Sequence, residues 1–261
     1  MTAPTPVTYR VEAGVATITL ASPETRNVLT AESMRLLSDR LRDAAQDHGV
    51  RVVVLTGEGT TFCAGADLAS ASAADSASFA SSGPAALVAV LEAMLDHPKP
   101  IVARVQGHVA GGGNGLVAAA DISVAAESAR FAFSEVRVGV APAVISVVVL
   151  ARMHPRDARE LFLTGERVSA TRVRDAGMVT AVAEDNALDA MVAAYVAQLQ
   201  QGGPKALAST KQLLATVPTM QRSEAFSAMA SLSASLFASD EAREGMTAFL
   251  ARRPPVWSPP T

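Results

Sequence analysis

The stretch that decides the fold is His108-Val109-Ala110-Gly111-Gly112-Gly113-Asn114-Gly115-Leu116. It follows the apolar run Ile101-Val102-Ala103-Arg104-Val105 and leads into Leu116-Val117-Ala118-Ala119-Ala120, which predicts a strand, a glycine turn and a helix. The first N–H groups of a helix have no partner within it, and glycine lets another molecule approach the main chain because it has no Cβ. The turn is therefore a place to stabilise developing negative charge. A tight turn without a function is the alternative for a lone glycine cluster.

A second turn of the same kind follows a neighbouring strand. Arg51-Val52-Val53-Val54-Leu55-Thr56 is typical of a buried strand, and Thr61-Phe62-Cys63-Ala64-Gly65-Ala66-Asp67-Leu68 comes just after it. Two such turns on neighbouring strands can each supply one N–H to a single carbonyl oxygen, which is the geometry of an oxyanion hole. The pair favours a functional interpretation over an ordinary turn.

With these two turns, the chain resembles the crotonase superfamily of enoyl-CoA hydratases and isomerases over nearly its whole length. Five further motifs carry the resemblance, and they are Val105-Gln106-Gly107, Ala129-Arg130-Phe131 with Ser134-Glu135, Leu163-Thr164-Gly165-Glu166, Ala176-Gly177-Met178-Val179 and Glu244-Gly245-Met246-Thr247-Ala248-Phe249. Each is weak alone, and the ordered set is specific.

Composition narrows the function classes. The 261 residues are 49% hydrophobic and 18% charged, as in a globular protein, and the formal net charge of −3 argues against nucleic acid as the main partner. The single cysteine, Cys63, excludes an intramolecular disulfide and fits a reducing cytoplasm. We interpret Cys63 as a small buried residue, because no histidine is placed to activate it. Without a membrane-length apolar run or a signal peptide, we expect a cytoplasmic protein away from the membrane.

The order of elements predicts an α/β fold. Strands alternate with helices first, and helices dominate later. The resemblance implies a crotonase-type ββα spiral core over residues 1–200, with the acyl-CoA site, and a C-terminal helical trimerisation region with an extended tail over 201–261. The expected partners are an acyl-CoA substrate and further copies of the chain, in a homotrimer or a dimer of trimers.

Individual elements follow from the same patterns. The sequence predicts a hairpin over 7–20, helices over 31–48, 84–95 and 143–153, and short strands over 122–124, 130–133 and 179–182. The later helices are expected over 155–163, 170–176, 187–199, 204–215, 224–237 and 240–251. The Ala/Ser-rich run 69–83 is expected to be a lid that orders on binding, with Phe79 as its large apolar contact.

Rival glycine motifs fit less well. Gly113-Asn114-Gly115-Leu116-Val117-Ala118 matches G-x-G-x-x-A, and Glu135 falls about 20 residues on, as in a dinucleotide fold. Only a short helix fits before the strand at Ile122, whereas a crossover needs roughly a dozen residues. No P-loop lysine or G-x-S-x-G elbow is present. The four histidines, at positions 48, 97, 108 and 154, lack metal-ligand spacing, so no metal is implied.

The resemblance assigns the chemistry to three residues. The N–H groups of Ala66 and Gly112 would hold the thioester carbonyl and stabilise an enolate, and Glu135 would act as acid or base. The hydratases carry another glutamate at the position of Gly115, which is absent here. One glutamate leaves two chemistries open: a hydratase that adds water to a 2-enoyl-CoA, and a Δ3,Δ2-enoyl-CoA isomerase that moves one proton between two carbons. The third interpretation is an acyl-CoA-binding protein with little catalysis.

The segment from Ser134 to Ser146 is similar to bacterial methylglutaconyl-CoA hydratases of leucine breakdown. They share the missing first glutamate, although they usually carry proline where this chain has Val147. Arg137 is the candidate partner for a carboxylate at the far end of such a substrate.

Contacts to CoA are also implied by the resemblance. CoA is part of the substrate, so no separate cofactor is expected. The turn around Arg26 and Val28 would lie along pantetheine and phosphates, and further substrate contacts would come from Ala64, Asp67, Leu68 and Gly111. Phe249 would touch adenine and Arg252 a phosphate, often across a subunit boundary, because their spacing places them on one helical face. The alternatives are a solvated Arg26, a core Phe249 and an Arg252 at a helix end.

Overall fold

The computed structural model describes residues 5–67 and 76–258, with the backbone alone for residues 76–82. Its strands form two sheets, one in the order β1-β2-β3-β5-β7-β10 and one in the order β4-β6-β8-β9. The larger sheet contains β1 (Val7–Glu12), β2 (Val15–Leu20), β3 (Val52–Gly57), β5 (Ile101–Val105), β7 (Ile122–Ala126) and β10 (Ala181–Ala183). The smaller sheet contains β4 (Thr61–Cys63), β6 (His108–Ala110), β8 (Arg130–Ala132) and β9 (Arg167–Ser169).

A strand-strand-helix repeat builds the core. The chain passes from the larger sheet to the smaller through β3 and β4, then β5 and β6, then β7 and β8. The helices that follow are α3 (Ser76–Leu95), α4 (Gly112–Ala119) and α5 (Ala143–Val149). Successive strands of the repeat pair in parallel within each sheet. This arrangement is the predicted α/β fold with its ββα spiral.

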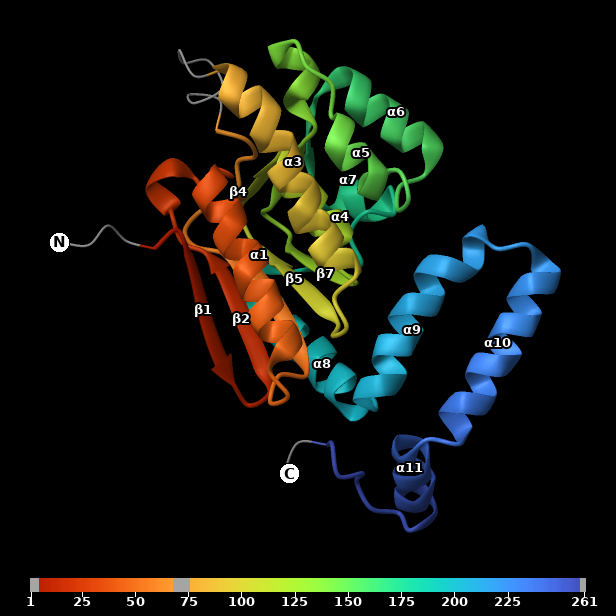
Figure 1. Cartoon of the computed structure of the whole chain (residues 1–261). Helices are drawn as coiled ribbons and strands as arrows, with labels where there is room; N and C mark the ends of the chain where they lie inside the picture. Colours follow the sequence, from red (N-terminus) through yellow and green to blue (C-terminus); the bar gives the residue numbers. More distant parts are fainter. Residues whose placement is uncertain (1–4, 68–75, 259–261) are drawn as a thin grey trace.

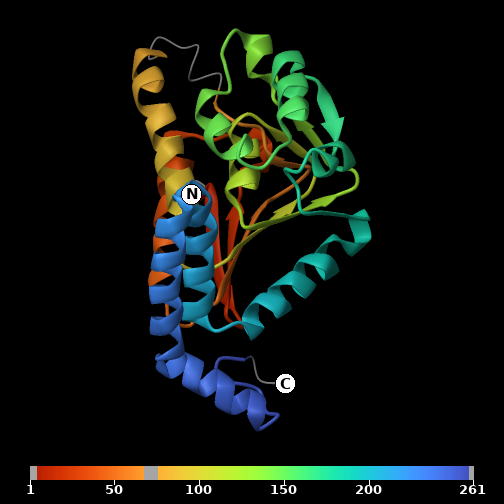
Figure 2. The ribbon, with the colours of Figure 1, turned by 90° about the vertical axis from the view of Figure 1, so that its right-hand side faces the viewer.

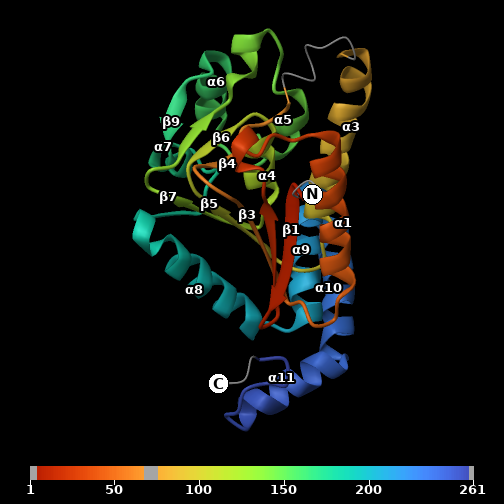
Figure 3. The same ribbon diagram turned by 90° about the vertical axis from the view of Figure 1, so that its left-hand side faces the viewer.

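Helices cover both faces of the larger sheet. On one face α1 (Ala31–Gln46) contacts β1 and β2 and packs beside α3, and on the other α8 (Leu188–Gln201) crosses β3, β5 and β7. Figure 3 shows the sheet between these two layers. The helix α1 begins with a reciprocal cap, because Thr30 and Ser33 each accept the other's backbone N–H. Two further helices, α6 (Pro155–Thr164) and α7 (Ala170–Asp175), lie beyond α5 (Figure 1).

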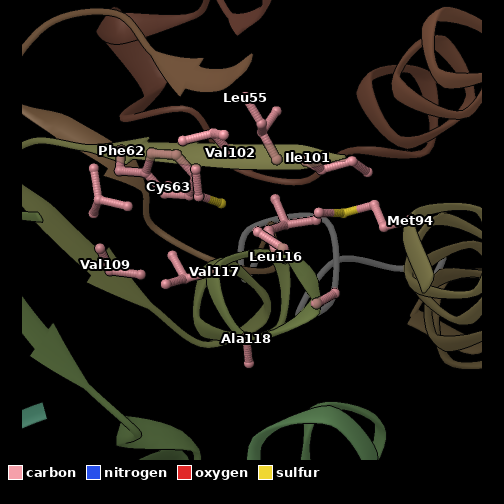
Figure 4. Packing of buried hydrophobic residues seen from close by; sticks show 14 of the residues in the cluster. Leu55, Phe62, Cys63, Met94, Ile101, Val102, Val109, Leu116, Val117 and Ala118 are labelled. Atoms are coloured by element: carbon pink, nitrogen blue, oxygen red, sulfur yellow. The ribbon is translucent and has the colours of Figure 1, made fainter. Parts of the chain in front are cut away.

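The glycine-rich helix α4 lies inside the molecule. All eight of its residues are buried, and it contacts α3, α5 and strands of both sheets. In Figure 4, Leu116 and Val117 lie among side chains from β4, β5 and β6, with Met94 of α3 nearby. Apart from Asn114, whose Nδ2 donates to the Ala132 carbonyl, the residues of α4 are glycine or apolar, as is typical of a helix enclosed on all sides. Its N-terminus is therefore held rigidly where the strand β6 ends.

The C-terminal helices leave the core and then return to it. Figure 1 shows α9 (Pro204–Thr216) and α10 (Arg222–Phe237) running in opposite directions with a gap between them, and α11 (Asp240–Leu250) lies below them in Figures 1 and 2. The tail turns back to the end of α8, where the Trp257 indole N–H donates to the Gln201 carbonyl. Arg51 donates to the carbonyls of Gly202 and Trp257 and so ties this tail to the core. No helix within the described ranges is long and apolar enough to cross a membrane.

Two expectations about local structure are wrong. The helix α3 begins at Ser76 rather than at Pro84, which lies inside it. Proline removes only one backbone hydrogen bond from a helix, and α3 as a whole packs against α1 and α4. Residues 76–83 of the expected lid are thus part of a helix, while 69–75 lie outside the described residues. The strand β9 was not expected from its sequence, and it forms by antiparallel pairing with β8.

Candidate active site

A cavity of about 370 Å³ lies where the two predicted oxyanion turns meet. Ala64 and Ala66 come from the turn after β4, and Gly111 and Gly112 from the turn after β6. The remaining wall consists mainly of apolar side chains, and it includes Leu29, Met34, Gly83, Pro84, Leu87, Ser134, Glu135, Val138, Val140, Ala141, Pro142, Ala143, Val144 and Ile145. A larger, open hollow of about 540 Å³ lies over the β1–β2 hairpin, and its lining residues include none of the predicted site.

The turn after β4 aims one backbone N–H toward the cavity. The Gly65 carbonyl accepts the Leu29 N–H at 2.7 Å, as part of a parallel bridge between Leu29 and Ala66. The carbonyl and the N–H of one trans peptide point in opposite directions, so the Ala66 N–H points away from Leu29. The position of a Cβ on Gly111 lies 3.9 Å from the Ala66 nitrogen. The donor predicted on Ala66 therefore faces the other turn.

Glycine is required where the two turns touch. Gly65 has a φ of +87°, and a Cβ there would lie 2.9 Å from the Ala110 carbonyl oxygen. Gly111 has a φ of +51° and is the residue before α4, which places Gly112 in the first turn of that helix. An N–H in this position has no carbonyl partner within its own helix. The structure thus brings the two predicted donors to one cavity.

Glu135 reaches the same cavity from a 3-10 turn over Ser134–Val138. One carboxyl oxygen, Oε1, lies 3.9 Å from the Cβ position of Gly111, and the other, Oε2, is buried without a hydrogen-bond partner. Burial raises the pKa of this carboxyl, and a hydrogen bond from its own backbone N–H opposes the shift. A carboxyl group with a raised pKa, beside two backbone donors, can pass a proton to an adjacent carbon.

Beside Gly115, where the hydratases carry their other glutamate, the structure has the apolar side chain of Ile145. Gly115 lies in the buried helix α4, and a Cβ at this position would be 2.8 Å from Cγ2 of Ile145 on α5. Real Cβ atoms essentially never come this close to another heavy atom, so a side chain at Gly115 would require Ile145 to shift. Ile145 lines the cavity instead.

The predicted CoA contacts near this cavity are only partly placed. Ala64 lines the cavity. Arg26 is exposed and Val28 half-buried on the turn before α1, and Asp67 is half-buried on the turn after β4. Leu68 lies outside the described residues. The roles of these residues in binding stay predictions.

The Arg137 side chain does not point into the cavity, although Arg137 lies only two positions after Glu135 in the sequence. Its Nε donates to the Thr164 carbonyl at 3.2 Å, and its side chain packs at Gly165 beyond the end of α6. A 3-10 turn advances by about 120° per residue, so residues two apart lie on different sides of it. Arg137 is accordingly not among the residues that line the cavity.

The helical-face argument for Phe249 and Arg252 is wrong. The helix α11 ends at Leu250, and Arg252 has a left-handed backbone with a φ of +53°. The Arg253 N–H then bonds to the Ala248 carbonyl, as in a Schellman motif, so the chain reverses where the expected face would continue. Phe249 is 82% exposed on α11. Figure 1 shows this helix at the opposite end of the molecule from the cavity helices α3, α4 and α5.

The remaining reactive side chains are occupied by packing. Cys63 is fully buried on β4, and burial raises the pKa of its thiol to about 12, in agreement with a packing role. His97 is buried between the Leu41 and Lys99 backbones, and burial lowers its pKa. Within the two described ranges no three His, Cys, Asp or Glu residues are grouped to hold a metal ion.

Sequence reasoning missed residues whose importance depends on contacts far along the chain. Asn27 was passed over inside the predicted CoA turn, although it is 2% exposed and bonded to four backbone groups. Ile145 was noted only as part of a motif. A polar residue between Arg26 and two apolar residues was the sole available signal for Asn27.

The spiral of ββα units and the paired backbone turns define a protein of the crotonase superfamily. Residues 10–260 match the family model "Enoyl-CoA hydratase/isomerase", and the chain belongs to this family. It is 32% identical to the enoyl-CoA hydratase EchA19 of Mycobacterium tuberculosis, over 91% of each chain. It is likewise 32% identical to carnitinyl-CoA dehydratase of Salmonella typhimurium, over 92% of this chain and 93% of the relative.

Solved structures agree with this assignment. The crystal structure of an enoyl-CoA hydratase from Mycobacterium smegmatis superposes with a TM-score of 0.91 at 32% identity, covering 97% of this chain and 98% of that one. An enoyl-CoA hydratase from Mycobacterium avium is 41% identical, with a TM-score of 0.75, over 98% of this chain and 100% of its own. The family includes hydratases and isomerases, and the similarity does not distinguish them.

Proposed function

We propose that the chain is an enoyl-CoA hydratase that adds water to a 2-enoyl-CoA thioester. The observation that carries the proposal is the buried, unpartnered Oε2 of Glu135 in a cavity shared with Ala66 and Gly112. The two backbone N–H groups hold the thioester oxygen as negative charge develops on it. The water oxygen bonds to the β-carbon as the enolate forms, and Glu135 passes its proton to the α-carbon and takes up the proton that the water loses. Burial raises the pKa of this carboxyl and so favours its protonated form.

A 3-methylglutaconyl-CoA substrate is the finer form of this proposal. It rests on the segment from Ser134 to Ser146 and on Gly115. The carboxylate of that substrate needs a cation, and Arg137 would have to leave the Thr164 carbonyl to supply it. Breaking one hydrogen bond at an exposed position is a small cost, because water replaces the lost partner.

The second candidate is a Δ3,Δ2-enoyl-CoA isomerase. The observation that favours it is the contact of Ile145 with the Gly115 position, because the hydrocarbon excludes a second acid that would hold water. One carboxyl group is enough to move a proton between two carbons. Hydration by Glu135 requires the same group both to hold water and to protonate carbon.

One assay separates these possibilities. Purified protein is mixed with crotonyl-CoA, 3-methylglutaconyl-CoA and a 3-enoyl-CoA, and the absorbance of the conjugated thioester is followed for wild type and Glu135→Gln. We expect absorbance to fall with at least one 2-enoyl substrate, and the substitution to abolish the fall. A rise with the 3-enoyl substrate alone would establish the isomerase instead. Binding without turnover, unaffected by Glu135→Gln, would support an acyl-CoA-binding protein.

We further propose assembly into a homotrimer or a dimer of trimers through the C-terminal helices. Support comes from large apolar side chains that these helices leave exposed, namely Phe226, Phe237, Phe249 and Leu250. Exposed aromatic groups on one region favour burial against another subunit. Light scattering of the purified chain measures the mass, and a monomer at micromolar concentration would overturn this part of the proposal.

A further inference from the structure

Asn27, on the turn before α1, is a buried polar residue whose side chain bonds to four backbone groups. Its side chain is almost fully enclosed, at 2% exposure. Its Oδ1 accepts the Ser22 N–H at 2.9 Å. Its Nδ2 donates to the Thr61 carbonyl at 2.7 Å and to the carbonyls of Glu58 and Phe62 at 3.0 and 3.3 Å. With two hydrogens for three acceptors, the side-chain amide is fully used, and it joins the turn to the strand β4.

The backbone of the turn is held in an uncommon conformation. Arg26 and Asn27 have φ angles of 60° and 54°, in the left-handed region, and neither is glycine. Two consecutive left-handed residues persist only where surrounding contacts impose them, and such positions concentrate at functional sites. Asparagine tolerates this region better than most residues. The side-chain hydrogen bonds of Asn27, together with backbone bonds from Arg26 to Pro23 and from Asn27 to Ser22, hold the turn in this conformation.

The turn that contains Asn27 is hydrogen-bonded to the loop after β4, which carries the predicted donor Ala66. The Arg26 carbonyl accepts the Ala64 N–H at 3.0 Å, and the Leu29 N–H donates to the Gly65 carbonyl at 2.7 Å. The second bond fixes the plane of the peptide between Gly65 and Ala66. Because that peptide is planar, fixing its carbonyl also fixes the direction of the Ala66 N–H.

We propose that Asn27 is a positioning residue that sets the direction of the Ala66 N–H in the oxyanion hole. The inference deepens the proposed function and rests on it. Asn27 is not among the residues that line the cavity, so it would act through Leu29 and the Gly65–Ala66 peptide. Misaligned donors weaken the bond that grows as the oxyanion forms, so loss of Asn27 lowers kcat more than it raises KM.

The test uses two substitutions of Asn27 and one matched control. Asn27→Asp keeps the shape and removes the donor, and Asn27→Gly removes the amide but adopts a φ of 54° without strain, so it is the variant chosen to fold. Gln200→Glu is the control, because Gln200 is 9% exposed and donates through Nε2 to the Ala13 carbonyl at 2.8 Å, away from the cavity. Melting temperatures are measured for all three.

The decisive readout is the infrared stretch of butyryl-CoA labelled with ¹³C at its carbonyl, bound at equal occupancy. Butyryl-CoA cannot be hydrated, so the spectrum reports the donors without turnover. Wild type and Gln200→Glu are expected to lower the frequency equally, and the Asn27 variants to lose about half of the shift or more. In the crotonyl-CoA assay, we expect kcat of the Asn27 variants to fall about tenfold to a hundredfold.

The outcomes separate the two claims. If the wild-type protein binds butyryl-CoA without lowering the carbonyl frequency, the proposed function fails, whatever Asn27 does. If the wild type lowers it and a folded Asn27→Gly lowers it equally, the positioning role of Asn27 is overturned. A loss of shift in Gln200→Glu as large as in the Asn27 variants would also overturn it, since destabilisation alone would then explain the effect.

Discussion

Cγ2 of Ile145 lies 2.8 Å from the point where a side chain on Gly115 would begin. A side chain at position 115 would therefore require this methyl group on α5 to move. This packing matters for the reaction, because Glu135 is the sole carboxylate that the described residues contribute to the cavity lining.

The first prediction concerns this contact. Gly115→Ala overpacks the core, which costs about 1–3 kcal/mol, while the helix gains up to about 1 kcal/mol from alanine. We expect a net loss of unfolding free energy, measured by urea denaturation. Adding Ile145→Ala removes Cγ2 and should make the Gly115→Ala cost disappear in a double-mutant cycle. Ile145→Val keeps Cγ2 and is the matched control, so relief by valine would contradict the contact.

The second prediction concerns the pH dependence of Glu135. Burial raises its folded pKa above the unfolded value of 4.5, so the folded state binds the proton more tightly. Between those two values the unfolding free energy falls as pH rises, and the glutamine variant lacks this loss. The melting temperature of Glu135→Gln relative to wild type should therefore increase from pH 4 to pH 8. A difference that is constant with pH would show that Glu135 is not desolvated.

The third prediction concerns Cys63. Its thiol is fully enclosed and its pKa is raised to about 12, so almost no thiolate forms near neutral pH. Iodoacetamide at pH 8 should leave the native protein unlabelled and its activity unchanged. The same reagent in denaturant should label the single thiol, as read by mass spectrometry. Rapid labelling and inactivation of the native protein would reopen a reactive role.

The fourth prediction concerns the attachment of the tail. Arg51 donates to the carbonyls of Gly202 and Trp257, both at 2.6 Å, and hydrogen bonds to charged groups contribute about 1.5–3 kcal/mol each when desolvated. Arg51→Met keeps the apolar stem and loses both bonds. We expect faster tryptic cleavage after Arg252. Arg42→Met, an exposed change on α1, is the control. Equal cleavage rates in both variants would show that Arg51 does not hold the tail.

The sequence predicts the parts of this protein that depend on local chemistry. The turns at Gly65 and Gly111 were found because glycine is required where two backbones approach closely, and a run of small residues reveals that need. A helix after this run was also expected, but α4 begins at Gly112 and includes glycines that were expected to form the turn. The ββα spiral was expected from the family resemblance rather than from periodicity.

Long-range contacts account for what was missed. Pro84 indicated a helix start, yet it lies inside α3, which packs against α1 and α4. The closeness of Arg137 to Glu135 in sequence gave no information about direction, because the 3-10 turn separates their side chains. The roles of Asn27 and Ile145 appear only when residues 30 or more positions apart are brought together.

The central claim is that Glu135 moves a proton at the carbon beside a carbonyl held by Ala66 and Gly112. Exchange of the α-protons of butyryl-CoA in D₂O, followed by NMR, tests it for hydratase and isomerase alike. We expect exchange with wild type and a rate about 10²- to 10⁴-fold lower with Glu135→Gln. Exchange at equal rates in both proteins, or its absence in wild type with butyryl-CoA bound, would contradict the account.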